Sequence, residues 1–533
     1  MNRRTLLAAG TGFAAAAAWT VGNGQVNAAP GHGSTANAGR RAGTRGTASA
    51  AAGRAGAPTA ADWTALGRGL QGRLIRPGDA DYATARQLYN TRFDGLRPAS
   101  VAYTANTTDV AECLAFARRH GTPVAIRNGG HSYAGWSSGN GRLVIDVSAL
   151  KSIRTDSGSA VIGAGAKLID VYTQLGAHGV TVPGGSCPTV GISGLTLGGG
   201  HGVVSRAYGL TSDSLTGARI VTADGRTLDV SKDREADLFW ALRGAGNGNF
   251  GVVTELRFRT HKAADGVTAY MTWPWSKAAA VLRSWQEWGP RQPDEIWSAL
   301  HLSAAPGRTP TISVACFSLG TYGALQNAVD RLADGVGGPG PASYVTLKRR
   351  GYLDTMRMYA GCATKSTTQC HLPGKTPGRQ PTGMLQRETY GARSDFFDRS
   401  LSAAGIRALL DQVERYGRRT GGGGAVSVAL TALGGAVNRV SPQATAFVHR
   451  NSRFLAQYTA SWPAGGSGSV QTAWLDGAHA AMRRYASGAA YQNYTDATLK
   501  DWRSAYYGPA ADRLTRLKKR YDPNRLFDFP QAL

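Results

Sequence analysis

Two glycine-rich stretches in the first half of the chain each hold one side chain that could contact a ligand directly. His131 lies in residues 127–135 (Arg-Asn-Gly-Gly-His-Ser-Tyr-Ala-Gly), and Cys187 lies in residues 184–202. Glycine lets the backbone adopt positive φ and approach a ligand closely, and successive N–H groups in such turns bind anions. We therefore predict a phosphate-bearing cofactor here, with His131 and Cys187 as candidates for direct contact.

The common phosphate-binding motifs do not fit this sequence. A dinucleotide-binding fingerprint needs a third glycine, and residues 163–165 and 244–246 both lack it. Gly374-Lys375-Thr376 ends like a P-loop but lacks the glycine five positions before Gly374. The predicted cofactor therefore needs another kind of glycine loop.

Two other kinds of enzyme site fit the sequence poorly. Residues 130–134 (Gly-His-Ser-Tyr-Ala) resemble a degenerate nucleophile elbow of a serine hydrolase, but Ala replaces the last Gly and no helix follows. A zinc site needs His and Cys at short spacing, which neither His120 with His131 nor Cys187 with His201 provides. Neither site is favoured, and we expect no metal.

The elements around these stretches indicate an α+β region followed by an antiparallel sheet. In the first region we expect a helix with a Thr cap at 108–120, strands at 124–126, 143–147, 160–166, 215–223, 227–230 and 251–256, and a third glycine loop at 244–251. In the second we expect strands at 270–273, 297–302, 311–317, 425–430 and 454–458, and helices at 278–288 and 406–416. A single final helix is expected at 501–521. A sheet backed by helices leaves one face free to build a pocket.

Length and charge limit the partners. A chain of 533 residues predicts two domains. The formal charge is +26, to which six arginines in the first 60 residues contribute, and the remaining basic residues are spread out apart from a cluster at 513–525. This favours a general basic surface over a nucleic-acid site. No interior stretch is long and apolar enough to span a membrane.

The N-terminus predicts export. Residues 2–7 (Asn-Arg-Arg-Thr-Leu-Leu) form a twin-arginine pattern, an Ala-rich apolar run follows, and Val26-Asn27-Ala28 supplies a cleavage site. We assign residues 1–28 as a twin-arginine signal peptide and 29–61 as a flexible linker. The mature protein is then secreted and free of the membrane. In an oxidising compartment Cys362 and Cys370 can pair, and the sequence leaves this open.

Several motifs taken together resemble one family. The two glycine stretches, residues 248–251 (Gly-Asn-Phe-Gly), residues 491–494 (Tyr-Gln-Asn-Tyr) and residues 521–523 (Tyr-Asp-Pro) resemble the berberine-bridge-enzyme-like flavoproteins, which belong to the vanillyl-alcohol-oxidase group. The resemblance covers roughly residues 62–533. It implies an α+β fold in which a two-subdomain PCMH-type FAD-binding domain adjoins an antiparallel-sheet substrate domain backed by helices.

The resemblance also implies domain limits and a cofactor. The FAD-binding domain spans 62–262, the substrate-binding domain 263–480, and residues 481–533 complete the FAD-binding domain. FAD is attached twice, through His131 to the 8α-methyl group and through Cys187 to C6 of the flavin. The residues implied to hold it are Arg127, Asn128, Gly129, Gly130, His131, Ser132, Cys187, Gly191, Ser193, Gly194, Gly199, Gly200, His201, Gly248, Gly251, Val253, Asn493 and Tyr494.

The resemblance assigns two residues to the chemistry. Tyr491 is the expected general base, which takes the substrate hydroxyl proton as hydride leaves for flavin N5. Its usual pKa is about 10, so the site must lower that pKa. Gln457 is expected to face the pocket. Leu455 stands where some plant members have a lysine, and His201 is expected either to touch flavin or substrate or simply to pack.

These expectations define a secreted FAD-dependent oxidase. Its partners are a small-molecule alcohol (a sugar, an oligosaccharide or the hydroxyl of a glycosylated secondary metabolite) and O2, which is reduced to H2O2. We expect a monomer with no nucleic-acid partner. The alternatives are a flavin dehydrogenase that avoids O2, an oxidative cyclase of a natural product, and a basic binding protein of the extracellular surface. The sequence does not identify the substrate.

Overall fold

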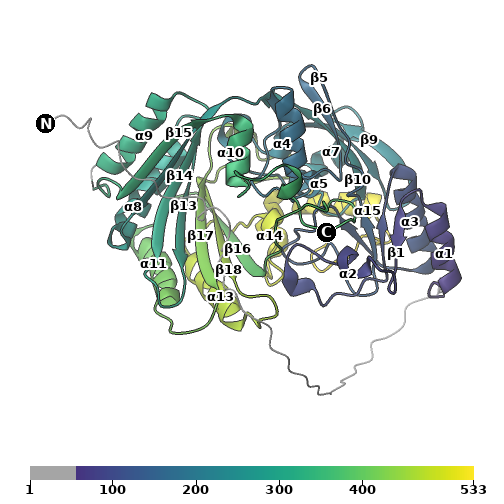
Figure 1. Cartoon of the computed structure of the whole chain (residues 1–533). Helices are drawn as coiled ribbons and strands as arrows, with labels where there is room; N and C mark the ends of the chain where they lie inside the picture. Colours follow the sequence, from purple (N-terminus) through teal and green to yellow (C-terminus); the bar gives the residue numbers. More distant parts are fainter. Residues whose placement is uncertain (1–55, 336) are drawn as a thin grey trace.

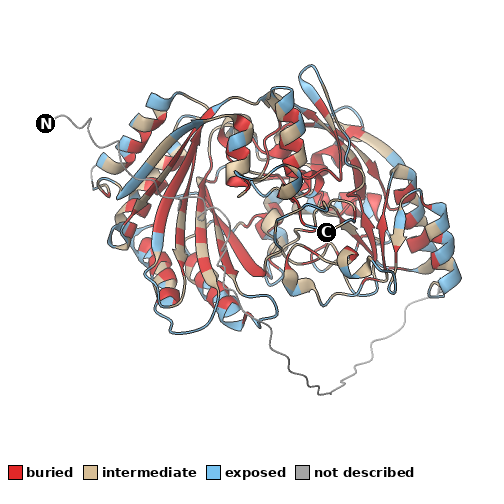
Figure 2. Ribbon diagram, viewed as in Figure 1, coloured by how far each residue is buried: buried red, intermediate tan, exposed pale blue. Residues whose placement is uncertain are grey.

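The protein consists of two adjoining parts, shown by the computed structural model in Figure 1. The structure describes residues 56–335 and 337–533, so the predicted signal peptide and most of the predicted linker lie outside the described residues. Two smaller sheets and their helices form one part, and a seven-stranded sheet with its helices forms the other. Most strands are buried, and exposed residues concentrate on the outer helices and loops (Figure 2).

The first small sheet has the strand order β1-β2-β4-β3. These strands are β1 (Arg73–Ile75), β2 (Ser100–Tyr103), β4 (Leu143–Asp146) and β3 (Val124–Arg127). β2, β4 and β3 are parallel, so Tyr103, Asp146 and Arg127 end at one edge, where the first glycine stretch begins. Helix α3 (Thr107–His120) is capped by the side chain of Asn106, which accepts from Asp109 N, so the predicted Thr cap is wrong.

The second small sheet has the strand order β5-β6-β10-β8-β9. It comprises β5 (Ile153–Asp156), β6 (Ser159–Gly163), β10 (Val252–Arg259), β8 (Leu215–Val221) and β9 (Thr227–Ser231). The predicted hairpin turn at Gly225 joins β8 to β9, with φ of 88°. This part also contains α1 (Ala60–Gly69), α2 (Tyr82–Ala85), α4 (Leu168–Ala177), α5 (Ile192–Leu197), α6 (Ser205–Tyr208), α7 (Ala236–Leu242) and the pair β7 (Val180–Thr181) and β11 (His261–Lys262).

The large sheet is antiparallel throughout, with the order β15-β12-β14-β13-β17-β18-β16. Its strands are β12 (Gly266–Trp273), β13 (Ile296–Ala304), β14 (Thr311–Ser318), β15 (Tyr344–Arg350), β16 (Tyr390–Phe397), β17 (Ala425–Ala432) and β18 (Phe454–Ser461). Helices α8 (Ala278–Trp288), α9 (Tyr322–Asp334), α11 (Ala403–Gly417) and α13 (Ser469–Arg483) cover one face and share a hydrophobic core with it. The predicted antiparallel sheet backed by helices is confirmed. Its other face points toward the glycine stretches.

Buried arginines fasten the two parts together. Arg206, at α6, donates from Nε to Ile296 O at 2.9 Å. Arg450, which follows the short helix α12 (Ala436–Arg439), forms a buried ion pair with Asp213 at 2.7 Å. Because breaking one partner of a buried pair leaves an uncompensated charge, these contacts hold the large sheet in one position against the glycine stretches.

The C-terminal segment returns to the first part of the molecule. It contains α14 (Trp502–Tyr507) and α15 (Ala511–Tyr521), so the prediction of one helix over 501–521 is wrong. Gly508 has φ of 44° and Pro509 has no N–H to donate, and together they end the first helix. Lys518 of α15 donates to Asn249 O at 2.8 Å, which ties this segment to the third glycine loop.

A long connection between β15 and β16, residues 351–389, also reaches the first part, and we call it the crossing segment. It begins with α10 (Tyr352–Tyr359) and contains the disulfide Cys362–Cys370, which answers the pairing question that the sequence left open. His371 contacts Asp170 of α4 at 3.1 Å. The crossing segment therefore packs against α4 of the first part.

Candidate active site

The structure brings the two glycine stretches into backbone contact. A Cβ atom on Gly129 would lie 2.6 Å from Gly191 N and from Thr189 O, and a Cβ atom on Gly191 would overlap the Asn128 side chain. Asn128 donates from Nδ2 to Ser193 Oγ at 3.1 Å. This contact needs glycine at both positions, and it sets residues 127–135 and 184–202 side by side as one surface, which we call the glycine wall.

His131 is held on the glycine wall in its neutral form. Its Nε2 lies 2.8 Å from Thr189 Oγ1, and its ring stacks on Tyr89 with centroids 4.0 Å apart. Burial, with a smaller effect from the charge of Lys167, lowers the pKa of His131 to about 3. A neutral imidazole keeps a lone pair, which covalent attachment requires.

Cys187 lies on the glycine wall with an accessible thiol. Its side chain is exposed and forms no disulfide. Desolvation by the surrounding protein, and then the charge of Glu388, raise the pKa of this thiol to about 11. The thiol is therefore protonated at neutral pH and remains available for reaction.

Charged groups beneath the glycine wall fit a phosphate-bearing cofactor. Arg127 is paired with Asp146, and its Nη1 is buried without a hydrogen-bond partner among the described residues. Lys167 donates to Asn128 Oδ1 and to Ser148 Oγ, and burial lowers its pKa to about 8. The added Cβ of an alanine at Gly194, in the first turn of α5, would meet nothing within 4 Å. Positive charge, open backbone and the side chains of His131 and Cys187 together fit FAD.

Tyr491 reaches the glycine wall from the C-terminal segment. Its hydroxyl accepts from Gly200 N at 2.9 Å and from Asn493 Nδ2 at 2.9 Å. Burial raises the pKa of Tyr491 to about 12, although the N–H groups of Gly200, Asn493 and His201 oppose that shift. The expectation of a lowered pKa is wrong, because burial raises the pKa by more than the N–H donors lower it.

Asn493 connects three loops at this point. Besides its bond to Tyr491, it donates from Nδ2 to Leu195 O at 2.9 Å and accepts from Asn247 Nδ2 at 3.0 Å. A Cβ atom on Gly198 would overlap its side chain. Asn493 therefore positions Tyr491 against the second glycine stretch.

His201, Tyr494 and Gln457 meet around Tyr133, a residue that the sequence analysis did not assign to the site. His201 Nε2 lies 2.8 Å from the Tyr494 hydroxyl, and Tyr494 stacks on Tyr133 with centroids 5.3 Å apart. Gln457 donates from Nε2 to the Tyr133 hydroxyl at 2.8 Å. The signal for Tyr133 was its place in the first glycine stretch. It links that stretch to the large sheet.

Other predicted residues have more distant or structural roles. Ser132 Oγ accepts from Trp136 N at 3.1 Å and so closes its own turn. Gly130 has φ of 69°. Gly248 and Gly251, with φ of 75° and 156°, shape the loop before β10, whose second residue is Val253. Gly199, with φ of 118°, packs against Phe447.

Leu455 lies in an apolar cluster with Tyr491 and Phe396. No amine stands at this position of the sheet, because Leu455 occupies it. Any activation of Tyr491 therefore depends on the N–H donors described above rather than on a neighbouring lysine.

The face of the large sheet opposite its helices forms a second surface, which we call the sheet wall. Strand pairing places Ser313, His301, Ala429, Gln457 and Ser394 in one row across β14, β13, β17, β18 and β16. Ser303, Ser427 and Thr459 form the next row. His301, Ser303, Ser427, Ala429 and Gln457 are partly exposed on this side, whereas their strand neighbours are buried against the helices. The sheet wall therefore offers small and hydroxyl-bearing side chains to a ligand.

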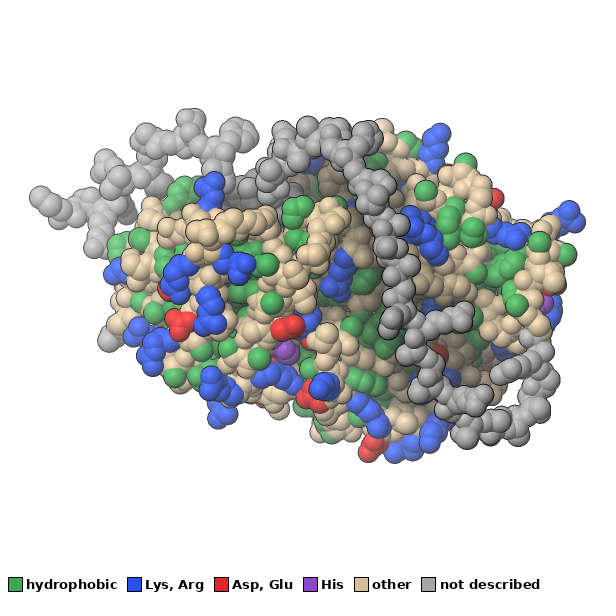
Figure 3. Space-filling view, turned by 90° about the horizontal axis from the view of Figure 1, so that it is seen from below, with side chains coloured by type: hydrophobic (Ala, Val, Ile, Leu, Met, Phe, Trp, Pro, Cys, Tyr) green, Lys and Arg blue, Asp and Glu red, His purple; other side chains and the backbone are tan. Residues whose placement is uncertain are grey.

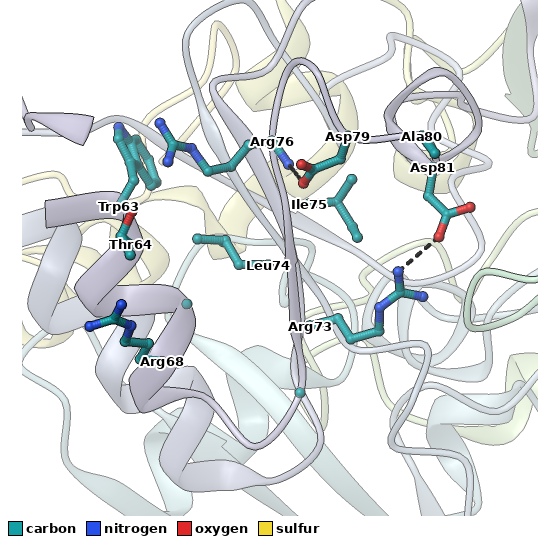
Figure 4. Close-up of a pocket in the computed structure, with 12 residues that line it drawn as sticks. Trp63, Thr64, Arg68, Arg73, Leu74, Ile75, Arg76, Asp79, Ala80 and Asp81 are labelled. Carbon is teal, nitrogen blue, oxygen red and sulfur yellow. Dashed lines mark hydrogen bonds and ion pairs between the residues drawn. The ribbon is translucent and has the colours of Figure 1, made fainter. Parts of the chain in front are cut away.

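A separate pocket of about 430 Å³ lies between α1 and β1 (Figure 4). Charged residues border it, among them Arg68, Arg73 and Arg76, and Arg73 pairs with Asp81 at 2.8 Å. None of the predicted site residues lines it. This pocket is therefore separate from the candidate active site.

The part of the chain that the structure describes has neither a candidate metal site nor a membrane-spanning helix. Within it, no group of three or more His, Cys, Asp or Glu side chains could hold a metal ion. Its helices include none with the length and apolarity of a membrane span. Lys and Arg side chains are scattered over the face shown in Figure 3.

Comparison with known proteins agrees with the family resemblance of the sequence motifs. Residues 98–231 match the model of an FAD-binding domain, and residues 490–533 match the model described as berberine and berberine-like. The chain is 31% identical over 470 residues to the FAD-linked oxidoreductase YgaK of Bacillus subtilis, which covers 87% of this chain and 97% of that protein. It is 30% identical to the chitooligosaccharide oxidase of Gibberella zeae, over 84% of this chain and 89% of that protein. The structure of Physcomitrella patens BBE-like 1 superposes with a TM-score of 0.78 at 29% identity, covering 88% of this chain and 98% of the other.

The two small sheets, the glycine wall and the matched FAD-binding model define an FAD-linked oxidoreductase, which overturns the serine hydrolase and binding-protein interpretations. Within that class the chain belongs to the berberine-bridge-enzyme-like family of FAD-linked oxidases.

Proposed function

We propose that this protein is an oxidase that holds FAD through both His131 and Cys187, oxidises an alcohol and reduces O2 to H2O2. The observation that carries the proposal is the glycine wall, which holds an accessible Cys187 thiol, a neutral His131 and the Gly200 N–H group that donates to the Tyr491 hydroxyl. Residues 62–262 and 481–533 would form the FAD-binding domain, and residues 263–480 the substrate-binding domain. The second boundary is better placed after Arg483, since 480 lies inside α13.

Bound FAD would supply the hydride acceptor. The site residues implied by the family would hold it through backbone N–H groups of the glycine wall, with Arg127 and Lys167 compensating negative charge. Asn128 and Ser193 fix the contact between the two stretches. His131 and Cys187 would prevent loss of the cofactor after export.

Tyr491 is the proposed general base. Its hydroxyl would take the proton of the substrate alcohol, and the N–H groups of Gly200 and Asn493 would stabilise the phenolate form that accepts this proton. Gln457, through Tyr133, would orient the substrate between the walls. Burial of Tyr491 keeps competing water away from the proton transfer.

The sheet wall supports a hydroxyl-rich, uncharged substrate such as a sugar or an oligosaccharide. Ser303, Ser427 and His301 present hydrogen-bonding groups on it, and burial lowers the pKa of His301 to about 4, so the imidazole stays neutral. The related chitooligosaccharide oxidase is named for a substrate of this class. A hydroxylated secondary metabolite is the second candidate, because the half-exposed Ala429 also gives the wall an apolar side chain. Export rests on the twin-arginine pattern of residues 1–28.

The test is the flavin itself. Purified protein should be yellow and should keep its flavin after acid precipitation, and sugars should yield H2O2. Cys187→Ala should keep flavin through His131 alone and should be reduced about tenfold more slowly, since one electron-withdrawing attachment is lost. Thr189→Ser, which retains the hydroxyl beside His131, is the control. Colourless protein, or flavin released by acid from the wild type, would contradict the proposal.

A further inference from the structure

Glu388 is a half-buried carboxyl group that the proposed reaction does not use. Desolvation raises its pKa to about 7, with a hydrogen bond from Tyr89 acting in the opposite direction. Asp224, Asp229 and Glu287 show the contrasting case, because hydrogen bonds from their partners lower their pKa. A carboxyl group that titrates near neutral pH at a candidate active site suggests a function in proton transfer.

Backbone contacts place Glu388 beside the glycine wall. It lies at the end of the crossing segment, two residues before β16. Tyr89 N donates to Gly130 O at 3.0 Å, and Thr91 N donates to Glu388 O at 2.9 Å. The short segment from Tyr89 to Thr91 therefore joins the first glycine stretch directly to Glu388.

The Tyr89 side chain links the Glu388 carboxyl group to His131. The Tyr89 hydroxyl hydrogen-bonds to Glu388, and the Tyr89 ring stacks on His131 at 4.0 Å. The charge of Glu388 also acts on the Cys187 thiol and raises its pKa. The same charge reaches Tyr133 of the glycine wall and Tyr390 of β16.

We propose that Glu388 accepts the thiol proton of Cys187 when this residue becomes attached to the flavin. This inference rests on the proposed bicovalent attachment. The S–H bond of Cys187 and the C6–H bond of the flavin break, and an S–C6 bond forms. The thiol proton passes to the Glu388 carboxylate, the C6 proton passes to solvent, and the two electrons released reduce O2, which takes up two protons to become H2O2.

The chemistry of the thiol explains why an acceptor is needed. The thiolate, not the thiol, is the nucleophile. With a pKa of about 11, only about one thiol in ten thousand is ionised at pH 7. An adjacent base with a pKa near the working pH is the most effective acceptor. Tyr89 acts as a positioning residue, since its hydroxyl donates to the carboxylate.

Glu388 is the group of this cluster whose pKa lies closest to neutrality; Lys167, whose charge reaches His131, has a pKa that burial lowers to about 8. The pKa values of Tyr89, Tyr133 and Tyr390 are raised well above their usual value, and that of His131 is lowered to about 3. A carboxylate is present above its pKa and lost below it. The rate of attachment at Cys187 should therefore increase as the pH rises through about 7.

The experiment follows each attachment separately. Full-length protein produced without flavin is mixed with FAD in air, and peptides containing residue 131 or residue 187 are quantified by mass spectrometry over time. Glu388→Gln keeps a hydrogen-bonding partner for Tyr89, and it should slow attachment at Cys187 at least tenfold while attachment at His131 is retained. Glu112→Gln, on the exposed side of α3, is the matched control and should behave as the wild type.

The outcomes separate this role from the proposed function. Normal attachment at Cys187 in Glu388→Gln would refute the role of Glu388 alone, whereas absence of the Cys187 bond in the wild type would refute bicovalent attachment itself. Equal slowing at both residues would indicate a structural effect and would also refute the role. If Glu388→Gln does not fold, the pH profile of the wild type decides, because a rate at Cys187 that is constant from pH 6 to 9 contradicts the proposal.

Discussion

The two walls of the candidate site are built in different ways. On the glycine wall, backbone lies on backbone: Gly129 and Gly191 have no room for a Cβ atom, and Gly200 directs its N–H group to the Tyr491 hydroxyl. On the sheet wall, side chains such as His301 and Ser427 alternate with residues buried against helices, and they are partly exposed.

The difference shows which wall can vary. A change on the glycine wall alters the position of the backbone that would hold the cofactor, so its effects spread to folding and cofactor binding. A change on the sheet wall exchanges one exposed side chain while the strand pairing stays intact. We infer that the glycine wall fixes the chemistry and that the sheet wall sets the choice of substrate.

Tyr491 belongs to neither wall, and its loss should have the largest effect on catalysis. Tyr491→Phe removes the proposed general base, which contributes about 10²–10⁴-fold to such reactions. We expect flavin reduction by substrate to slow by that factor in anaerobic stopped-flow measurements, with covalent flavin unchanged. Tyr494→Phe is the matched control and should slow reduction much less. Wild-type reduction rates in Tyr491→Phe would remove this residue from the mechanism.

A methyl group on the glycine wall should have the next largest effect. Gly129→Ala places Cβ 2.6 Å from Gly191 N and Thr189 O, and the backbone must move to relieve it. We expect the protein to lose about 3 kcal/mol or more of stability, as for other overpacked sites, measured by denaturant unfolding.

The comparison becomes sharper with a second glycine on the same wall. Gly194→Ala meets no protein atom within 4 Å and lies in a helix. Its stability should equal or exceed that of the wild type, since alanine favours helices by up to about 1 kcal/mol, while covalent flavin should decrease. Equal destabilisation by both substitutions would show that the glycine wall does not depend on close backbone contact.

A substitution on the sheet wall should have the smallest effect. Gln457→Leu removes the bond to the Tyr133 hydroxyl, which is worth about 0.5–1.5 kcal/mol. We expect kcat/KM to fall up to about tenfold, with unchanged flavin content and thermal midpoint. Gln326→Leu, on the exposed face of α9, serves as the control. A loss of bound flavin in Gln457→Leu would contradict the division of roles between the walls.

Much of the fold could be predicted because its signals are local. Alternation of buried and exposed residues indicated the strands β13, β17 and β18, and the Asp224-Gly225 turn indicated the hairpin of β8 and β9. The prediction of a single last helix was wrong because Gly508 and Pro509 divide residues 501–521 into two helices.

Local patterns in the sequence therefore indicate the glycine stretches, the candidate cofactor contacts His131 and Cys187, and the type of each sheet. These follow from interactions between residues near each other in the chain. The surroundings of these residues depend on tertiary contacts: Tyr491 is hydrogen-bonded to Gly200 across 291 positions, and Gln457 to Tyr133 across 324. Tertiary packing also places Glu388 beside the glycine wall, because the crossing segment returns to α4 and to Tyr89. Such contacts depend on how whole elements pack, and no local pattern in the sequence encodes them.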